Sequence, residues 1–186
     1  ASGRVLRDNV WGPMEEDAAR RDFSINAMYY DPTTQVVVDY HNGIRDAKKR
    51  VMRMIGEPAV RYREDPVRML RAIRFATKLG FSLDQATLDA IPRLRQLLED
   101  IAPARLFDEM LKMFHGGMGL QTFEALRHHG LFHCLFPQTD ELLDSPEGEF
   151  AGALIAAALA STDARLSENK PITPAFLLAA LLWHVV

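Results

Sequence analysis

The sequence of 186 residues lacks most of the features that mark secreted or membrane proteins. It holds one cysteine, Cys134, so no disulfide can form within the chain and nothing points to an oxidising compartment. It has no apolar run of about 18 residues, the length that a membrane-spanning helix needs. Low-complexity tracts and fixed-period repeats are absent as well. With 48% hydrophobic and 25% charged residues, the composition is that of a folded globular protein, and we expect it in the cytoplasm.

The sequence also has no strong excess of either charge. It contains 22 Lys and Arg and 25 Asp and Glu, which gives a formal net charge of −3. Taken alone, this value argues against a nucleic-acid partner. The charges are unevenly distributed, however. Residues 1–80 carry 15 basic and 11 acidic side chains, whereas residues 81–186 carry 7 and 14. We therefore expect any site for a polyanion to lie before Gly80.

Hydrophobic patterning predicts a mainly α protein with a small α/β part at its N-terminus. Residues 25–30 and 35–40 are rich in Val, Ile and Tyr and flank a turn composition at 31–34, which predicts a β-hairpin. From Pro66 onward the pattern is helical. The expected helices are residues 45–50, 66–79, 84–98 with a break near Pro92, 103–116, 120–129, 150–160 and 174–186.

The expected helix after Asp65 carries the most informative side chains. Asp65 has the chemistry of an N-cap. A stripe of basic residues occupies one face of the helix and consists of Arg68, Arg71, Arg74 and Lys78. One interpretation is a solvated charged face, and the other is a phosphate-binding surface, since a guanidinium binds phosphate oxygens bidentately. Asp65 and Arg68 together also present an acceptor and a donor to a base edge, although a helix cap and an ion pair explain both residues without a ligand.

Other candidates carry weaker signals. Arg20–Phe23 has groups that would bind a phosphate and a ribose hydroxyl, but a surface ion-pair cluster is the simpler interpretation. The residues His128, His129, His133 and Cys134 lack zinc-site spacing, so we expect no metal site there. Residues 116–119 are expected to form a helix C-cap and turn rather than a phosphate loop.

Two long motifs, about 40 residues apart, resemble signatures of the class II nucleotidyltransferases. The first is RRDFSINA at residues 20–27, and the second is REDPVRMLRAIRFA at residues 63–76. Between them, the family's Asp-x-x-x-Gly-x-x-Asp element is matched by Asp39, Gly43 and Asp46. The family contains the bacterial poly(A) polymerases and the CCA-adding tRNA nucleotidyltransferases. Residues 103–110 and 131–137 look more like the first branch, and the second is the alternative.

The resemblance implies two domains. Residues 1–58 would be a remnant of the nucleotidyltransferase head, and residues 59–186 a helical neck and body, incomplete at its C-terminus. The implied reaction is template-independent transfer of AMP from ATP to RNA 3′ ends. In the family, residues at the positions of Arg21 and Asp22 contact the ribose, and the position of Asn26 shapes the ribose pocket.

The second motif implies contacts with the base and the phosphates. Asp65 and Arg68 would face the base edge, with Glu64 orienting Arg68, and Arg71 would reach the triphosphate. Further contacts with RNA or phosphate are expected from two residues of the stripe, Arg74 and Lys78.

The family's metal-binding carboxylates belong to a Gly-Gly-x-x-Arg-Asp segment and an Asp-x-Asp element, which this sequence lacks. Their pattern is not matched by the N-terminal acidic residues Asp8, Glu15, Glu16 and Asp17. Mg²⁺ is therefore expected to bind residues outside this chain, and the chain alone to be inactive. The start at Ala1 and the apolar run at 176–183 suggest a piece cut at both ends. A non-catalytic RNA-binding module is the rival hypothesis.

Overall fold

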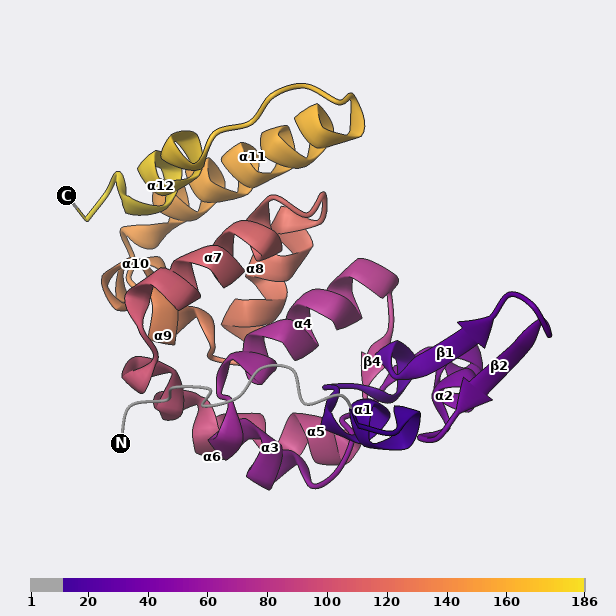
Figure 1. Ribbon diagram of the computed structural model, residues 1–186. Coiled ribbons are helices and arrows are strands. Elements are labelled where there is room, and N and C mark those ends of the chain that lie inside the picture. The colour runs from indigo at the N-terminus through magenta and orange to yellow at the C-terminus, as the bar shows by residue number, and fades with distance from the viewer. Residues whose placement is uncertain (1–11, 186) are drawn as a thin grey trace.

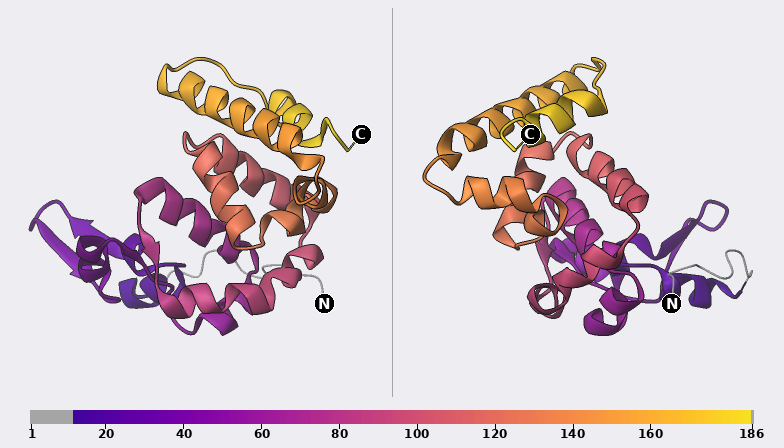
Figure 2. Two further views of the ribbon diagram at one scale, coloured as in Figure 1. Left: turned by 180° about the vertical axis from the view of Figure 1, so that it is seen from behind. Right: turned by 90° about the vertical axis from the view of Figure 1, so that its left-hand side faces the viewer.

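The computed structural model describes residues 12–185 as an array of helices with a small β-hairpin part at one end (Figure 1). Asp8, one of the acidic residues that do not match the family's metal-binding pattern, lies outside the described residues. Figure 2 shows the hairpin and the last two helices at opposite ends of the molecule, with the remaining helices between them. The predicted fold class, mainly α with a small N-terminal hairpin part, is confirmed.

The N-terminal part consists of short elements. They are α1 (Met14–Arg20), the 3₁₀ turn η1 (Ser24–Asn26), β1 (Met28–Asp31), β2 (Val36–Asp39) and α2 (Gly43–Lys49). The two strands are antiparallel, with Met28 opposite Asp39. The hairpin begins three residues later than predicted because Ser24–Asn26 forms a 3₁₀ turn, in which the Ala27 N–H donates to the Ser24 carbonyl at 3.3 Å.

The remainder is almost entirely helical. Its elements are β3 (Val51–Met52), α3 (Pro58–Glu64), α4 (Val67–Leu79), β4 (Ser82–Leu83), α5 (Gln85–Asp89), α6 (Ile91–Leu94), η2 (Arg95–Asp100), α7 (Pro103–Phe114), α8 (Gly119–His128), α9 (Phe132–Leu135), α10 (Pro137–Leu143), α11 (Gly148–Ser167) and α12 (Pro174–Leu182). Within residues 12–185, no helix is both long and apolar enough to cross a membrane.

The break expected near Pro92 is present. Residues 84–98 are divided among α5, α6 and η2, since Pro92 lacks the N–H for a continuous ladder and sits in the first turn of α6. Other elements were not predicted. The parallel pair β3–β4 was not predicted, because two-residue strands leave no periodic signal. The helices α1, α3, α9 and α10, each of seven residues or fewer, were also not predicted.

One hydrophobic core runs through most of the molecule. It includes Phe23 and Met54 from the N-terminal part, Tyr62 from α3 and Leu181 from α12, and each is at least nine-tenths buried. The core therefore takes residues from both sides of the expected domain boundary at 58/59. That boundary stays a prediction.

Helix α4 lies at the centre and is amphipathic. Its buried residues are Val67, Met69, Leu70, Ala72, Ile73 and Ala76, and they face the core. The opposite side of the helix carries the basic stripe. Gly80 ends the helix with φ of +63°, a conformation that glycine adopts without strain. The packing of α4 therefore decides what surrounds each arginine of the stripe.

Candidate nucleotide-binding site

Asp22 lies between two arginines of α4. Its Oδ1 accepts from Nε of Arg68 at 2.9 Å, and its Oδ2 accepts from Nε of Arg71 at 2.7 Å. The side chains of Asp22 and Arg68 are 12% and 13% exposed, and that of Arg71 is 32% exposed. The three residues, which we call the Asp22 cluster, bring the two motifs of the sequence together.

Backbone pairing fixes the position of Asp22. Phe23 forms an isolated antiparallel bridge with Met54, and the Asp22 carbonyl accepts from the Ile55 N–H at 3.0 Å. The buried Phe23 ring packs edge-on against Phe75 of α4, with 6.0 Å between ring centroids. Because side chains alternate along an extended segment, burial of Phe23 sets the direction of its neighbour Asp22.

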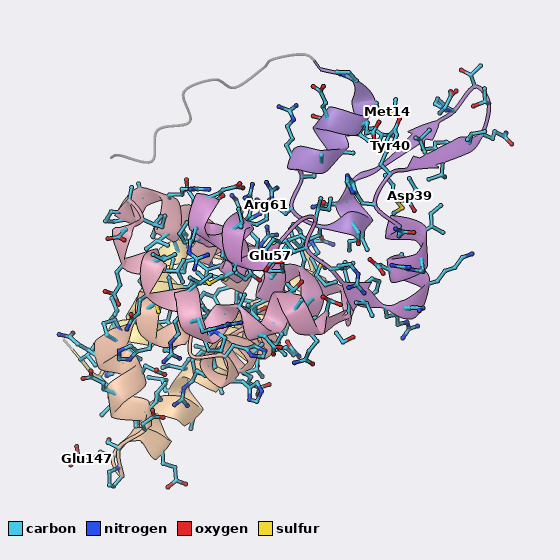
Figure 3. The ribbon with its side chains drawn as sticks, turned by 90° about the horizontal axis from the view of Figure 1, so that it is seen from below. Met14, Asp39, Tyr40, Glu57, Arg61 and Glu147 are labelled. Carbon is cyan, nitrogen blue, oxygen red and sulfur yellow. The ribbon has the colours of Figure 1, made fainter. Side chains whose placement is uncertain are left out.

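Arg61 joins the first motif to the second. Its Nη2 donates to the carbonyl oxygens of Arg20 at 2.9 Å and Arg21 at 2.8 Å, and its Nη1 donates to Oε2 of Glu64 at 2.9 Å. The same Glu64 oxygen accepts from Nη1 of Arg68 at 3.0 Å. This geometry is the one expected if Glu64 orients Arg68. Figure 3 shows Arg61 near the junction of the hairpin part with the helices.

Arg61 was missed as a site residue. Its side chain is only 15% exposed although it bears a full charge. The available signal was its place in Arg61–Arg63, directly before the second motif.

Arg21 and Asn26, also from the first motif, contact α1 and the turn η1. Arg21 donates from Nη2 to Oδ2 of Asp17 at 3.0 Å and from Nη1 to the Asn26 carbonyl at 3.2 Å. Its guanidinium also lies 5.2 Å from the centroid of the Tyr29 ring. Asn26 Oδ1 accepts from the Phe23 N–H at 3.2 Å and so closes the turn η1. The described bonds of Arg21 thus go to α1 and η1 rather than to the Asp22 cluster.

Asp65 was expected to be the N-cap of α4, but it ends α3, Pro66 is the N-cap, and α4 begins at Val67. Oδ1 of Asp65 accepts from the Val67 N–H at 3.2 Å. Oδ2 accepts from Nη2 of Arg105, at the start of α7, at 2.6 Å. The ion pair between Asp65 and Arg68 that was one interpretation is not formed, since each side chain has other partners.

Arg74 and Lys78 occupy different environments. Arg74 donates from Nε to Oε1 of Glu109 at 2.7 Å, and its guanidinium lies 4.1 Å from the centroid of the Phe75 ring. The side chains of Arg74 and Glu109 are 14% and 4% exposed, whereas Lys78 is exposed. A solvated charged face is therefore the wrong description of the stripe except near Lys78.

The Asp-x-x-x-Gly-x-x-Asp element holds α2 against η1, the turn that follows Asp22 in the chain. Asp39 accepts from the backbone N–H groups of Gly43 at 2.8 Å and Ile44 at 3.0 Å, and so caps α2. Although burial opposes it, these hydrogen bonds hold the pKa of Asp39 below its ordinary value. A Cβ on Gly43 would lie 2.3 Å from the Ser24 carbonyl oxygen, so only glycine lets α2 approach η1. Buried Asp46 accepts from Oγ of Ser24 at 2.8 Å.

Two family models match the chain. Residues 4–53 match the poly A polymerase head domain, and residues 80–143 match a probable RNA and SrmB-binding site of polymerase A. Poly(A) polymerase I of Haemophilus influenzae is 49% identical over 98% of this chain and 40% of its own length. Poly(A) polymerase I of Escherichia coli O157:H7 is 46% identical over 98% of the chain and 39% of its own length.

The chain belongs to the nucleotidyltransferase family of poly(A) polymerases and CCA-adding enzymes. A CCA-adding enzyme of Lactobacillus helveticus is 40% identical over 60% of the chain and 28% of its own length. A solved tRNA nucleotidyltransferase, complexed with a primer tRNA and an incoming ATP analog, superposes with a TM-score of 0.73 at 28% identity over 96% of this chain and 53% of its own. The chain spans about 40% of the length of the curated poly(A) polymerases it matches.

The family's metal chemistry does not fit the described residues. Among residues 12–185 there is no group of three or more His, Cys, Asp or Glu side chains that could hold a metal ion. The two carboxylates of the second motif are engaged by guanidinium groups, since Glu64 accepts from Arg61 and Asp65 from Arg105.

Proposed function

We propose that the protein carrying this chain transfers AMP from ATP to RNA 3′ ends and releases pyrophosphate. The Asp22 cluster carries the proposal, because it joins residues of both family motifs in one partly buried site. Similarity favours the polyadenylating branch. Poly(A) polymerases match 98% of the chain at 46–49% identity, whereas CCA-adding enzymes match 60–66% of it at 38–40%. Because its proposed substrates are RNA and ATP, we expect it to act in the cytoplasm.

The base contact is proposed for Arg68. Its Nε donates to Asp22 and its Nη1 to Glu64 and the Arg61 carbonyl, so three acceptors fix the plane of the guanidinium. The N–H groups of Nη2 then point in a defined direction and can be offered to a base edge. Asp65 would add an acceptor beside them. Preorganised donors of this kind select a base without a template, because a base with the wrong edge leaves them unpaired.

The triphosphate contact is proposed for Arg71, whose side chain is the most exposed in the Asp22 cluster at 32%. Both its Nε and its Nη2 face Asp22, at 2.7 and 2.5 Å, which leaves Nη1 to reach phosphate oxygens. Arg21, Asp22 and Asn26 would form the ribose side of the site. We further propose that Mg²⁺ is held by carboxylates outside this chain and that the chain alone does not catalyse transfer.

The test of this function is the product made by the complete protein. It is incubated with Mg²⁺, one nucleoside triphosphate at a time, and either generic RNA or a tRNA that lacks its 3′ end. We expect a long A tail from ATP on both RNAs and no extension with CTP. Addition of C-C-A to the tRNA would support the CCA-adding alternative instead. RNA binding without extension by any nucleotide would indicate a non-catalytic module.

A further inference from the structure

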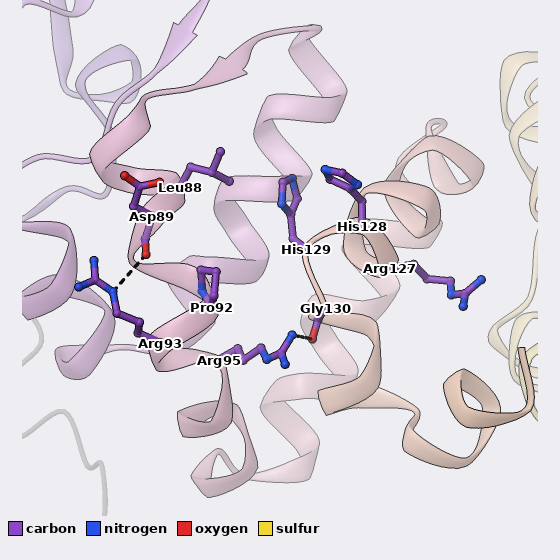
Figure 4. Close-up of a pocket in the computed structure, with 9 residues that line it drawn as sticks. All are labelled: Leu88, Asp89, Pro92, Arg93, Arg95, Arg127, His128, His129 and Gly130. Atoms are coloured by element: carbon purple, nitrogen blue, oxygen red, sulfur yellow. Dashed lines mark hydrogen bonds between the residues drawn. The ribbon is translucent and has the colours of Figure 1, made fainter. Parts of the chain in front are cut away.

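A basic groove lies outside the Asp22 cluster, where α5 and α6 meet the end of α8. It is an open cavity of about 760 Å³, and Figure 4 shows the side chains around it. The residues that line it are Leu88, Asp89, Pro92, Arg93, Arg95, Arg127, His128, His129 and Gly130. None of them belongs to the two family motifs, and they fall within the segment matched by the second family model.

Two arginines of the groove differ from those of the nucleotide site. Arg93 donates from Nε to the Asp89 carbonyl at 3.3 Å, and Arg95 donates from Nη1 to the Gly130 carbonyl at 3.5 Å. Within residues 12–185 neither guanidinium pairs with a carboxylate, whereas those of Arg68 and Arg71 do. Both groove arginines are exposed, so each keeps four of its five N–H donors for a ligand.

The backbone at Gly130 leaves room for the Arg95 side chain in the groove. Gly130 has φ of +66°, and a Cβ there would lie 1.8 Å from Nη1 of Arg95. A glycine therefore lets the guanidinium lie directly against the turn after α8. The neighbouring Arg127 pairs with Asp140 at 3.0 Å and also with Asp144. These carboxylates neutralise its charge, so Arg127 lines the groove without being available to bind a phosphate.

Two imidazoles complete the groove. The rings of His128 and His129 pack edge-to-face with 4.8 Å between their centroids. Burial and the neighbouring His128 both lower the pKa of His129. A neutral ring has a flat face on which a nucleobase can stack and an N–H that can donate. The carboxylate at the rim, Asp89, accepts from Nε2 of Gln85 at 2.7 Å.

We propose that this groove binds the backbone of single-stranded RNA through Arg93 and Arg95, with a base against the paired histidines. Guanidinium groups suit phosphate oxygens, and a positive groove lined with flat rings is the arrangement that single strands prefer. The groove lies on elements other than those of the Asp22 cluster. The choice of RNA as ligand rests on the proposed function.

The test compares the complete protein with its R93Q/R95Q variant. Binding of a fluorescent oligoadenylate is measured over a range of salt concentrations, without ATP or Mg²⁺, so that the readout does not depend on nucleotide transfer. Loss of two phosphate contacts should weaken binding at least fivefold at low salt and reduce the slope of log affinity against log salt by about 1.4. The matched control, R50Q/R165Q, removes the same charge at exposed positions outside the groove and should change neither quantity.

The proposal would be overturned if R93Q/R95Q bound RNA with the affinity and salt slope of the unchanged protein. This holds even if the variant had lost binding of a protein partner, since the groove would then be a protein-binding site. An equal loss in R50Q/R165Q would overturn it too, since the effect would then reflect net charge alone. Failure of the unchanged protein to extend any RNA would contradict the proposed function but would leave this binding comparison intact.

Discussion

At the scale of single residues, the candidate site depends on Asp22, which is 46 positions from Arg68 and 49 from Arg71. One carboxylate engages two guanidiniums, and all three side chains are at least two-thirds buried. Removing the charge would leave two cations in a partly buried place without compensation, which is costly. Asp22 is therefore expected to hold the two motifs together as well as to face the ribose.

The variant D22N tests this role, because an amide keeps the shape of the side chain and removes its charge. We expect it to lower the free energy of unfolding by about 2–3 kcal/mol, measured by urea denaturation. The control is D31N, since among the described residues the Asp31 carboxylate accepts from Thr33 and Thr34 of its own exposed hairpin turn. Equal stability of D22N and D31N would contradict the structural role of Asp22.

The sequence could predict which residues take part but not how they pair. The motifs identified Asp22, Glu64 and Arg68, because their types and order are characteristic of a family. A helical wheel shows only that the arginines of α4 share a face. It does not show which other elements cover that face. It therefore could not predict that Arg74 is buried against Glu109, 35 positions away in the sequence.

At the scale of elements, Asp39 determines where α2 begins. Its carboxylate accepts from N–H groups of the first turn, which helix termini leave without partners. Because the folded-state pKa of Asp39 lies below its unfolded value, the ionised carboxylate stabilises the fold above about pH 4, and this contribution is lost as the pH falls through the folded pKa.

The variant D39N should therefore have a pH-dependent effect. At neutral pH we expect it to cost about 1 kcal/mol, seen as a lower Tm. The difference in Tm between D39N and the unchanged protein should be smaller at pH 3 than at neutral pH, because the carboxylate of the unfolded chain, with an ordinary pKa of about 3.9, is then largely protonated. A difference of the same size at both pH values would show that the charge of Asp39 does not stabilise α2.

Element boundaries show where sequence reasoning succeeded and failed. The start of α4 and its end at Gly80 were predicted within one residue, because a capping carboxylate and a left-handed glycine are local signals. A break near Pro92 was also predicted, but the sequence left open whether the proline divides the helix or only bends it, because tertiary packing decides between the two.

At the scale of the whole molecule, a buried ion pair joins the central helix to the next layer. Arg74 of α4 and Glu109 of α7 lie 2.7 Å apart, and both are largely removed from water. Breaking such a pair leaves one buried charge, whereas replacing both partners by apolar residues of similar size does not. Lys112 also approaches Glu109, at 3.4 Å, from the exposed side.

We expect E109L to lower the free energy of unfolding by about 3–5 kcal/mol and R74M/E109L to recover most of the loss. Chemical denaturation of both variants gives the comparison. The folded double variant also tests the predicted phosphate role of Arg74, because a specific loss of RNA affinity would remain after the fold is restored. If R74M/E109L were as unstable as E109L, the ion pair would not be what links α4 to α7.

If the Asp22 cluster binds the incoming nucleotide, the ATP dependence of AMP transfer by the complete protein should change in the variant R71A. With R165A as control, we expect kcat/KM for ATP to fall at least tenfold in R71A, while thermal unfolding shows both variants folded. The effect should be larger for ATP than for the RNA primer, because Arg71 is proposed to reach the triphosphate. A value of kcat/KM for ATP within about twofold of that of R165A would contradict the account.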